Sequence, residues 1–351
     1  MMSSVNGFFS VLFLLNILCA AEREQTAHLI GEDTYKTFYQ LAASPVMKMS
    51  KEAAWKTAVP QIKHVLIKST VDGTRQPALF YDSGSKDKKP LLLALHSWSA
   101  DYQHQYSIPF GIWAVKNDWV FIHPDYRGAF TNKSATASEP AIQDILDALT
   151  YAISHARVDS DRIYITGFSG GAMVTLIMVG RYPQLWAGAA AWVPVYDLAK
   201  WYQELRKSGY NYTVHIRNSC GGPPLEGSES FLECRRRSAS SYLSNAYGKR
   251  VPVYIAAGIN DNFVNPSHSI MAFNDLAEKE ERITESDMSY IDKFRRIPDN
   301  LAASFHDSLF ADVRLPLLFE RKSNSVILKI FDGKHDIIFN AGLYWLSKQS
   351  K

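Results

Sequence analysis

The stretch that decides the fold is Gly167-Phe168-Ser169-Gly170-Gly171, a G-x-S-x-G pattern near the middle of the chain. Residues 162–166 (RIYIT), which precede it, are rich in β-branched side chains and predict a strand. Residues 172–179 (AMVTLIMV), which follow it, are apolar, lack proline and predict a helix. A sharp strand-to-helix turn of this kind exposes its serine at the end of a sheet, and only small neighbours fit beside it. The pattern therefore predicts that Ser169 is a nucleophile.

Strand and helix signals alternate on both sides of this turn. A helix is predicted over residues 141–155, where apolar side chains recur at i, i+3 and i+4, and a last helix is predicted from Asp336. Nearly continuous apolar strands that alternate with helices predict an α/β fold with a mostly parallel sheet covered on both faces. The predicted strands, besides the one before the turn, are residues 64–69, 78–81, 91–95, 119–123, 187–193, 251–258 and 326–331.

The N-terminal residues are typical of an export signal. No charged side chain occurs from Met1 to Ala21, and the apolar part, residues 8–17, is short for a membrane span. Small residues end this part before polar sequence begins at Glu22. We expect residues 1–21 to be a cleaved signal peptide, which predicts a secreted or periplasmic protein. Because no Lys or Arg precedes the apolar run, an uncleaved membrane anchor is the alternative.

Removal of this leader takes one of the three cysteines and leaves Cys220 and Cys234. An even remainder in an exported protein favours a disulfide, which would stabilise the irregular segment between them by about 3 kcal/mol. Two buried free thiols are the alternative. No second Cys/His pair stands at ligand spacing, so neither a metal site nor a cofactor is expected.

The composition is that of a globular protein with a sizeable core, at 46% hydrophobic and 21% charged residues. The net charge of +3 is too mild to indicate nucleic acid or an anionic membrane as a partner. Stable membrane association is expected only if the leader is retained. The composition carries no information on the oligomeric state.

The remaining chain is expected to form an N-terminal extension, residues 22–61, and one domain, residues 62–351. Within the domain, residues 197–250 and 276–324 exceed a minimal strand–helix repeat and are expected to be insertions at the carboxyl ends of the strands, where ligands bind in such sheets. The first insertion is aromatic from Trp201 to Tyr212, and these rings either stack on a substrate or pack the insertion itself. The run Arg235-Arg236-Arg237 either binds an acidic group or forms a solvated face.

A serine nucleophile needs a base, which is usually a histidine oriented by a carboxylate. In strand–turn–helix hydrolases, the chain order is serine, acid, histidine. Asp261 follows the predicted strand 251–258, and His335 lies in the loop after the last predicted strand. They are therefore the expected acid and base. Asp197 is the main rival acid, and His96 and His123 are expected to shape the floor of the cleft.

The oxyanion of an acyl-transfer intermediate needs two N–H donors. The backbone N–H of Gly170, directly after the nucleophile, is the expected first donor. The loop after the strand 91–95 reads His96-Ser97-Trp98-Ser99, and the backbone N–H of Trp98 is the expected second. In hydrolases with this turn, a glycine often stands where this chain has Ser97.

Four blocks carry a resemblance to a known family: LLLALHSW, VFIHPDYRG, YITGFSGGAM, and AAGINDNFVNPSHS together with FDGKHD. They resemble the α/β-hydrolases, most of all the catalytic domain of the prolyl oligopeptidase (S9) group and related secreted esterases, over residue 62 to the C-terminus. The resemblance implies Ser169 as nucleophile, Asp261 as orienting acid and His335 as general base. It departs from the oligopeptidases because residues 22–61 are far too few for their β-propeller.

The expected function is therefore a secreted serine hydrolase, most of all a carboxylic ester hydrolase acting through an acyl-enzyme. Its expected substrate is a small-molecule or glycan-linked ester, with an acyl or aryl group. The alternative is an S9-like serine exopeptidase for short peptides, although the sequence shows no anchor for a peptide terminus. A non-catalytic binding protein on the same scaffold is disfavoured, because such proteins normally lack a complete triad.

Overall fold

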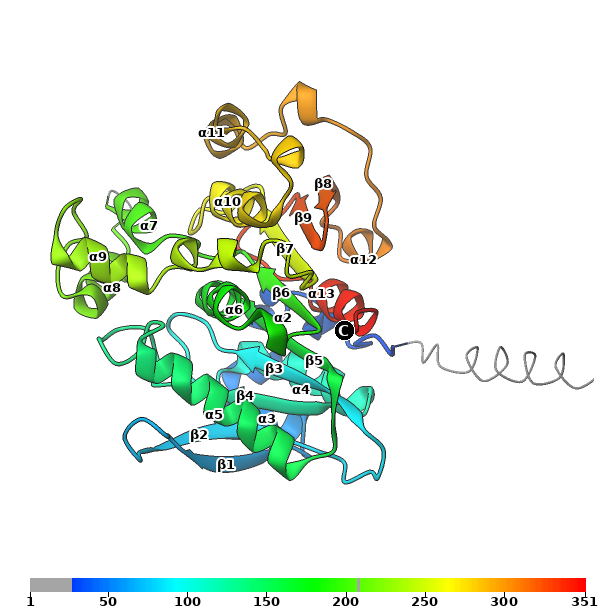
Figure 1. Cartoon of the computed structure of the whole chain (residues 1–351). Helices are drawn as coiled ribbons and strands as arrows, with labels where there is room; N and C mark the ends of the chain where they lie inside the picture. The colour runs from blue at the N-terminus through cyan, green and yellow to red at the C-terminus, as the bar shows by residue number, and fades with distance from the viewer. Residues whose placement is uncertain (1–26, 207–208) are drawn as a thin grey trace, which may run out of the picture.

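The computed structural model describes residues 27–206 and 209–351, so the expected signal peptide lies outside the described residues. The described chain is built around one nine-stranded sheet (Figure 1). Its strands are β1 (Lys63–Lys68), β2 (Arg75–Tyr81), β3 (Lys89–Leu95), β4 (Val120–Pro124), β5 (Val158–Phe168), β6 (Gly188–Trp192), β7 (Val253–Gly258), β8 (Leu317–Ser323) and β9 (Val326–Phe331).

The sheet order is β1-β2-β4-β3-β5-β6-β7-β9-β8. The pairs from β4 through β3, β5, β6 and β7 to β9 are parallel, whereas β1, β2 and β8 join antiparallel at the two sides. The expected mostly parallel sheet is thus confirmed. Parallel pairing brings the carboxyl ends of the central strands to one edge, where the loops that follow them meet.

Helices cover both faces of the sheet, and alternate side chains of β3 show the division. Leu91, Leu93 and Leu95 pack in one hydrophobic core with α5, α6 and α10. Leu92 and Ala94 pack in the other with α3, α4 and α13. The described helices are α2 (Phe38–Ala43), α3 (Lys51–Ala58), α4 (Ile108–Lys116), α5 (Glu139–His155), α6 (Gly170–Arg181), α7 (Leu198–Leu205), α8 (Tyr212–Cys220), α9 (Glu229–Arg236), α10 (Pro266–Leu276), α11 (Glu285–Phe294), α12 (Ser308–Ala311) and α13 (Phe339–Ser347).

The predicted elements recur with small shifts at their ends. The predicted strand 326–331 has the bounds of β9, and the predicted helix 141–155 begins two residues earlier, where Ser138 caps α5 by accepting from the backbone N–H of Ala141. The last helix begins at Phe339 rather than at Asp336. Residues 317–323 are expected from the sequence to be part of an insertion, whereas they form β8. This edge strand is half polar, with Glu320, Arg321 and Lys322 in its middle, so its sequence lacks the apolar run of a central strand.

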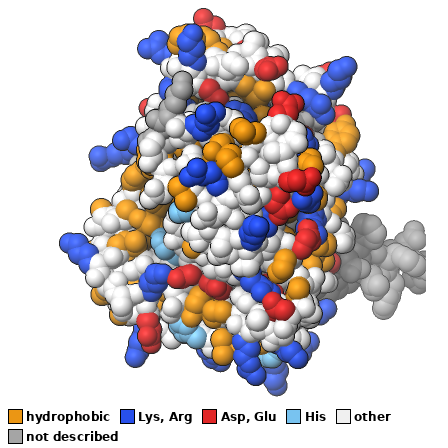
Figure 2. Space-filling view, turned by 90° about the vertical axis from the view of Figure 1, so that its left-hand side faces the viewer, with side chains coloured by type: hydrophobic (Ala, Val, Ile, Leu, Met, Phe, Trp, Pro, Cys, Tyr) orange, Lys and Arg blue, Asp and Glu red, His pale blue; other side chains and the backbone are white. Residues whose placement is uncertain are grey.

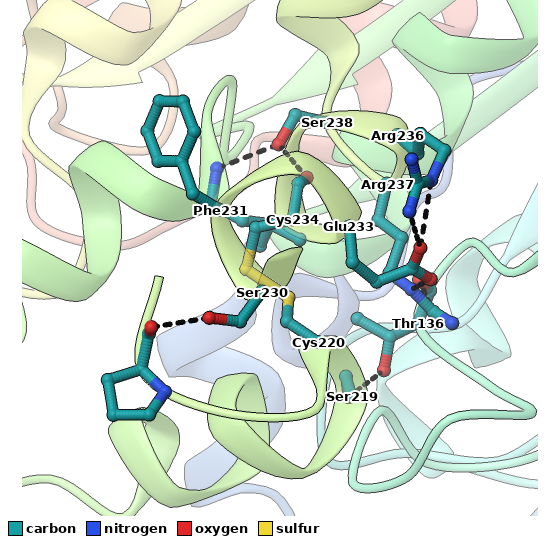
Figure 3. The surroundings of a disulfide bond; sticks show 12 residues. Thr136, Ser219, Cys220, Ser230, Phe231, Glu233, Cys234, Arg236, Arg237 and Ser238 are labelled. Atoms are coloured by element: carbon teal, nitrogen blue, oxygen red, sulfur yellow. Dashed lines mark hydrogen bonds and ion pairs between the residues drawn. A yellow bond between two sulfur atoms is a disulfide. The ribbon is translucent and has the colours of Figure 1, made fainter. Parts of the chain in front are cut away.

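The first insertion consists of α7, α8 and α9, and a disulfide ties the last two together. Cys220 at the end of α8 bonds to Cys234 in α9 with a Cα–Cα distance of 5.3 Å (Figure 3). The predicted pairing is confirmed, and the alternative of two free thiols is excluded. Beside it, the hydroxyls of Thr136 and Ser219 lie 2.7 Å apart, which joins α8 to the loop before α5.

The arginine run is divided between surface and interior. Arg235 and Arg236 are exposed, but Arg237 is buried and pairs with Glu233 at 2.6 Å. Arg237 also donates to the backbone carbonyls of Lys133 and Ala135, so it holds the loop before α5 against α9. On the face shown in Figure 2, basic side chains are scattered among acidic and apolar ones. None of the helices in the described ranges is long and apolar enough to cross a membrane.

Candidate active site

Ser169 sits in the turn between β5 and α6 with φ 56° and ψ −115°, a strained conformation for a residue other than glycine. Its backbone N–H donates to the carbonyl of Trp192 at 2.8 Å, which fixes the turn to β6. The flanking glycines are required by space: a Cβ on Gly167 would lie 2.3 Å from the backbone of Gly171, and one on Gly171 would lie 2.5 Å from the carbonyl oxygen of Leu95. Close packing of small residues therefore holds the turn in shape.

Asp261 and His335 are brought together by the register of β7 and β9. Gly258 pairs with Phe331 at the ends of these strands, and the two loops continue side by side. Nδ1 of His335 lies 2.6 Å from Oδ2 of Asp261. Because a carboxylate only accepts, Nδ1 carries the proton and Nε2 is left as an acceptor.

Asp261 is itself held rigidly. Its Oδ1 accepts from the backbone N–H groups of Phe263 at 2.8 Å and Val264 at 3.0 Å, and its side chain is 1% exposed. Both oxygens of the carboxylate thus have partners, and one of them is dedicated to His335. This arrangement fixes the plane of the imidazole.

The rival acid Asp197 has a different setting. It caps α7 by accepting from the backbone N–H of Lys200 at 2.8 Å, and its other oxygen accepts from the hydroxyl of Ser240 at 2.8 Å. Asp332, which directly follows β9, accepts from the side-chain amide of Asn260 at 3.0 Å. Of these carboxylates, Asp261 is the one that contacts His335.

Ser169 and His335 both line one cavity of about 360 Å³ at the carboxyl ends of the strands. The described side chains show no hydrogen bond between Ser169 Oγ and His335 Nε2. Such contacts are often long in enzymes without substrate and tighten when substrate binds. The cavity therefore brings together the expected nucleophile and base, with the acid behind the base.

The expected oxyanion donors also approach one another. Gly170 is the first residue of α6, and a Cβ at this position would lie 2.8 Å from the backbone nitrogen of Trp98. The carbonyl of Trp98 accepts from the backbone N–H of Phe130 at 2.8 Å, which anchors the loop after β3. The backbone of Gly170 at the start of α6 and that of Trp98 in the loop after β3 are therefore close neighbours, which an oxyanion site built from both would require.

The cavity wall is aromatic and uncharged. Among the described residues, its lining contains no Asp, Glu, Lys or Arg. Burial, aided by the nearby charge of Lys51, lowers the pKa of His104 to about 4, so this ring is neutral at neutral pH. The lining consists of Phe38, Tyr39, Leu95, Ser97, Trp98, Ser99, Ala100, His104, Tyr106, Ser107, Phe110, Phe168, Ser169, Trp201, Tyr212, Phe263, His335, Ile337 and Phe339.

His96 and His123 do not line the cavity, contrary to the expectation that they shape its floor. Both are completely buried, and Nε2 of His96 lies 2.6 Å from the carbonyl oxygen of Asp125. Burial lowers the pKa of His123 to about 3, so its ring is neutral. These two histidines belong to the interior behind the site.

The two insertions contribute differently to the cavity lining. Trp201 and Tyr212 of the first line the cavity, and Nε1 of Trp201 donates to the carbonyl of Phe263 at 2.7 Å. Tyr202 instead packs into the hydrophobic core. Residues 276–324 contribute no lining residue.

Sequence reasoning missed the residues that reach the cavity from the N-terminal extension, Phe38 and Tyr39. It also missed His104, Tyr106 and Phe110, which come from the segment after β3. The local sequence of neither segment carries a signal for this placement. Among the described residues, no three His, Cys, Asp or Glu side chains are grouped so as to hold a metal ion.

The sheet order, the strained serine turn and the His335–Asp261 pair define the class of the α/β-hydrolases. The sequence profile of the prolyl oligopeptidase family matches residues 113–290, about half of the chain. The chain belongs to the prolyl oligopeptidase family, whose members are serine hydrolases.

Curated relatives of low identity are esterases. The chain is 26% identical over 151 residues to a protein named probable acetylxylan esterase A of Aspergillus fumigatus, which covers 40% of each chain. It is 25% identical over 197 residues to feruloyl esterase B of Talaromyces funiculosus, which covers 50% of this chain and 55% of the relative. The matched region thus spans about half or less of these relatives.

Solved structures share the fold. Acylaminoacyl peptidase of Pyrococcus horikoshii superposes with a TM-score of 0.53 at 16% identity, over 78% of this chain and 37% of that one. A prolyl endopeptidase superposes with a TM-score of 0.50 at 18% identity, over 61% of this chain and 31% of that one. At these identities the likeness concerns the fold alone.

Proposed function

We propose that this protein is a secreted serine hydrolase that cleaves uncharged carboxylic esters through an acyl-enzyme. In this proposal Ser169 is the nucleophile, His335 the general base and Asp261 the acid that orients it. The backbone N–H groups of Gly170 and Trp98 bind the oxyanion. The observation that carries the proposal is an aromatic, uncharged cavity that holds Ser169 and the Asp261-bound His335 together.

The proposed acylation uses these groups in order. His335 Nε2 takes the proton of Ser169 Oγ as this oxygen attacks the ester carbonyl, and Asp261 stabilises the imidazolium that forms. The negative charge on the carbonyl oxygen is stabilised by the two backbone donors. When the intermediate collapses, the bond to the leaving oxygen breaks and His335 returns the proton to the alcohol. The acyl group remains on Ser169.

Deacylation repeats the sequence with water. His335 Nε2 takes a proton from a water molecule, whose oxygen attacks the acyl carbon at the same oxyanion site. Collapse returns the proton to Ser169 Oγ and releases a carboxylic acid. These side chains, the two backbone donors and water account for every bond and proton in the two proposed steps.

The lining favours an ester over a peptide terminus. An exopeptidase binds the charged amine or carboxylate at a peptide end, and burying such a charge without a partner is costly. The described lining offers no countercharge, whereas its rings suit neutral acyl or aryl groups. The names of the curated relatives, acetylxylan esterase and feruloyl esterase, agree with esters on plant polysaccharides as the natural substrates.

Secretion is part of the proposal. It is supported by the leader pattern of residues 1–21 and by the disulfide between Cys220 and Cys234, a bond that persists in oxidising compartments.

The deciding experiment is hydrolysis by the purified protein of p-nitrophenyl acetate, acetylated xylan, a feruloylated glycan and an aminoacyl anilide. We expect release from the esters and little or none from the anilide. Ser169→Ala should lower kcat/KM on esters by several orders of magnitude, on the order of 10³-fold or more, without changing the thermal unfolding temperature. Ser107→Ala, a matched change of another serine on the cavity wall, should stay within a few-fold of wild type.

Two results would contradict the proposal. If Ser169→Ala still hydrolyses esters, Ser169 is not the nucleophile. A kcat/KM on the anilide that exceeds the value on every ester would place the protein among the peptidases.

A further inference from the structure

The N-terminal segment forms part of the catalytic cavity although it lies far from Ser169 in sequence. Phe38 and Tyr39, the first two residues of α2, line this cavity together with Ser169 and His335. Phe38 is half-buried and Tyr39 is 43% exposed, so both offer ring surface to an incoming molecule.

Phe38 is the centre of a set of nearly parallel rings. Its ring lies 4.0 Å from that of Tyr106 at an angle of 28°, and 5.1 Å from that of Phe168 at 27°. Phe168 precedes the nucleophile and lies 4.9 Å from the ring of His335. The rings of Phe38 and Phe168 therefore connect the N-terminal segment to the ring of His335.

The segment is held in place by the loop that carries His335. The side chain of Asp336 accepts from the backbone N–H of Phe38 at 2.8 Å. Thr37 forms a β-bridge with Ile338, and the backbone N–H of Phe339 donates to the carbonyl of Lys36 at 3.1 Å. The ring of Phe38 is therefore fixed relative to the base rather than free to swing.

A second group of rings connects the first insertion to His335 through Phe263, in the loop after β7. Phe263 lies 5.4 Å from the His335 ring, and its neighbours Tyr212 and Trp201 also line the cavity. Trp201 is only 2% exposed, so most of its surface is committed to packing. Tyr212 and Phe263 are half-buried, as Phe38 is, and Tyr39 is the exposed ring among the described lining residues.

We propose that Phe38 and Tyr39 form a specificity-determining subsite that packs against a planar aromatic group of the ester substrate. This inference rests on the proposed ester hydrolysis and names its substrate class. Aromatic rings prefer offset or edge contacts with other rings, and a preordered ring loses little freedom when it binds one. The uncharged surroundings suit an aryl group without a net charge.

The test compares flat rings with saturated rings of the same size. The full protein is assayed on methyl benzoate against methyl cyclohexanecarboxylate, and on phenyl acetate against cyclohexyl acetate, with ethyl acetate as the reference. The variants are Phe38→Leu, which keeps apolar bulk but removes the ring, Phe38→Tyr, which keeps the ring, and Tyr39→Ala. Phe294→Leu changes an exposed ring outside the cavity and is the matched control.

We expect Phe38→Leu to lower kcat/KM for at least one aryl ester by roughly 3- to 10-fold, mainly through KM, as expected for a lost ring contact. The saturated esters and ethyl acetate should stay within about twofold of wild type, and Phe38→Tyr should restore the aryl preference. The pair that responds identifies whether the ring belongs to the acyl or the leaving group. Tyr39→Ala removes an exposed ring, so it provides the same comparison if Phe38→Leu does not fold.

An equal loss on all five esters, or no loss on either aryl ester, would overturn the inference. This failure is distinct from failure of the proposed function. In the first case wild type still hydrolyses esters through Ser169 without ring selectivity; in the second, wild type hydrolyses none of them or Ser169→Ala remains active.

Discussion

Ser169 adopts a backbone conformation that a serine holds only under constraint. The constraint comes from Gly167 and Gly171, which allow the strand, the helix and the loop after β3 to touch. The proposed nucleophile is therefore positioned by backbone packing and not by its own side chain. Two further residues can be tested singly: Asp261, the proposed orienting acid, and Asp336, which follows His335.

The proposed orienting role of Asp261 can be distinguished from the role of Asp197 by substitution. Asp261→Asn leaves a hydrogen-bond acceptor but removes the charge that stabilises the imidazolium, and it favours the wrong tautomer of His335. We expect kcat on p-nitrophenyl acetate to fall by roughly 10³- to 10⁴-fold. Asp197→Asn keeps an N-cap for α7, because Asn is an equally good cap, and should retain most of the activity. The opposite ranking of the two variants would assign the acid to Asp197.

Asp336 adds a pH dependence to stability. Burial raises its pKa to about 6, although backbone N–H groups that donate to it, including that of Phe38, act in the opposite direction. Between about pH 4 and pH 6 the native state keeps a proton that the unfolded chain has lost, so the free energy of unfolding falls as the pH rises. Above about pH 6 this loss is complete.

Asp336→Asn should remove that contribution. We expect the free energy of unfolding of wild type, relative to the variant, to drop by up to about 3 kcal/mol between pH 4 and pH 7. Denaturant unfolding of both proteins at a series of pH values measures the difference. A difference that does not change with pH, or that grows in favour of wild type toward pH 7, would contradict the assignment.

At the element scale, the first insertion depends on its disulfide. Its helices α7, α8 and α9 are short, and α8 and α9 lie side by side at the outer edge of the molecule (Figure 1). Helices of eight or nine residues are marginal by themselves, so packing and a covalent tie supply their stability. This insertion carries Trp201 and Tyr212, and the tie thus supports one wall of the cavity.

Removal of the disulfide should loosen this wall. Cys220→Ser combined with Cys234→Ser is expected to cost about 3 kcal/mol, because the bond closes a short loop. Thermal unfolding should shift down by a few degrees, and limited proteolysis should cut first within residues 212–236. Wild type treated with reductant should show the same shift. An unchanged unfolding temperature in both cases would mean that packing alone holds the insertion.

At the scale of the whole molecule, the N-terminal segment is tied to the last helix. Oδ1 of Asn340 accepts from the backbone N–H of Ile30 at 2.8 Å, and its Nδ2 donates to the carbonyl of Ile30 at 3.0 Å. Both residues are buried, so water cannot reach these polar groups, and the hydrogen bonds between them replace those that the unfolded chain makes with water. These bonds thereby tie the N-terminal segment to α13.

Asn340→Ala should release this tie. It leaves the buried N–H and carbonyl of Ile30 without partners, at a cost of about 2–3 kcal/mol. Amide hydrogen exchange of residues 27–38 should become faster, while exchange in β5 and β6 should change little. Asn300→Ala, which removes an exposed side chain bonded to Asp287, is the control. Unchanged protection of residues 27–38 would show that the tie is dispensable.

Much of this architecture is predictable because it is encoded in local patterns. The strand β7 is a continuous apolar run and β9 is apolar apart from Lys329, as expected of strands buried on both faces, and α5 carries its apolar residues at helical spacing. The turn at Ser169 needs small residues within five positions. The acid and the histidine follow strand ends, so their meeting at one edge follows from parallel pairing.

Other features were missed for equally physical reasons. β8 lies at the sheet edge, and the polar run from Glu320 to Ser323 that follows its three apolar residues resembles a loop. The contact of Phe38 with Asp336 joins residues 298 positions apart, and no local pattern encodes it. The same holds for Trp201 and Tyr212, whose rings face the cavity while Tyr202 faces the core.

The sequence by itself thus determined the α/β class, the strained serine turn and the order of the candidate catalytic groups, because each depends on spacing along the chain. Only the tertiary structure decided which rings surround Ser169 and that no charged side chain lines the described cavity. These properties arise from packing between segments that are distant in sequence, where shape and burial, not local propensity, choose the neighbours.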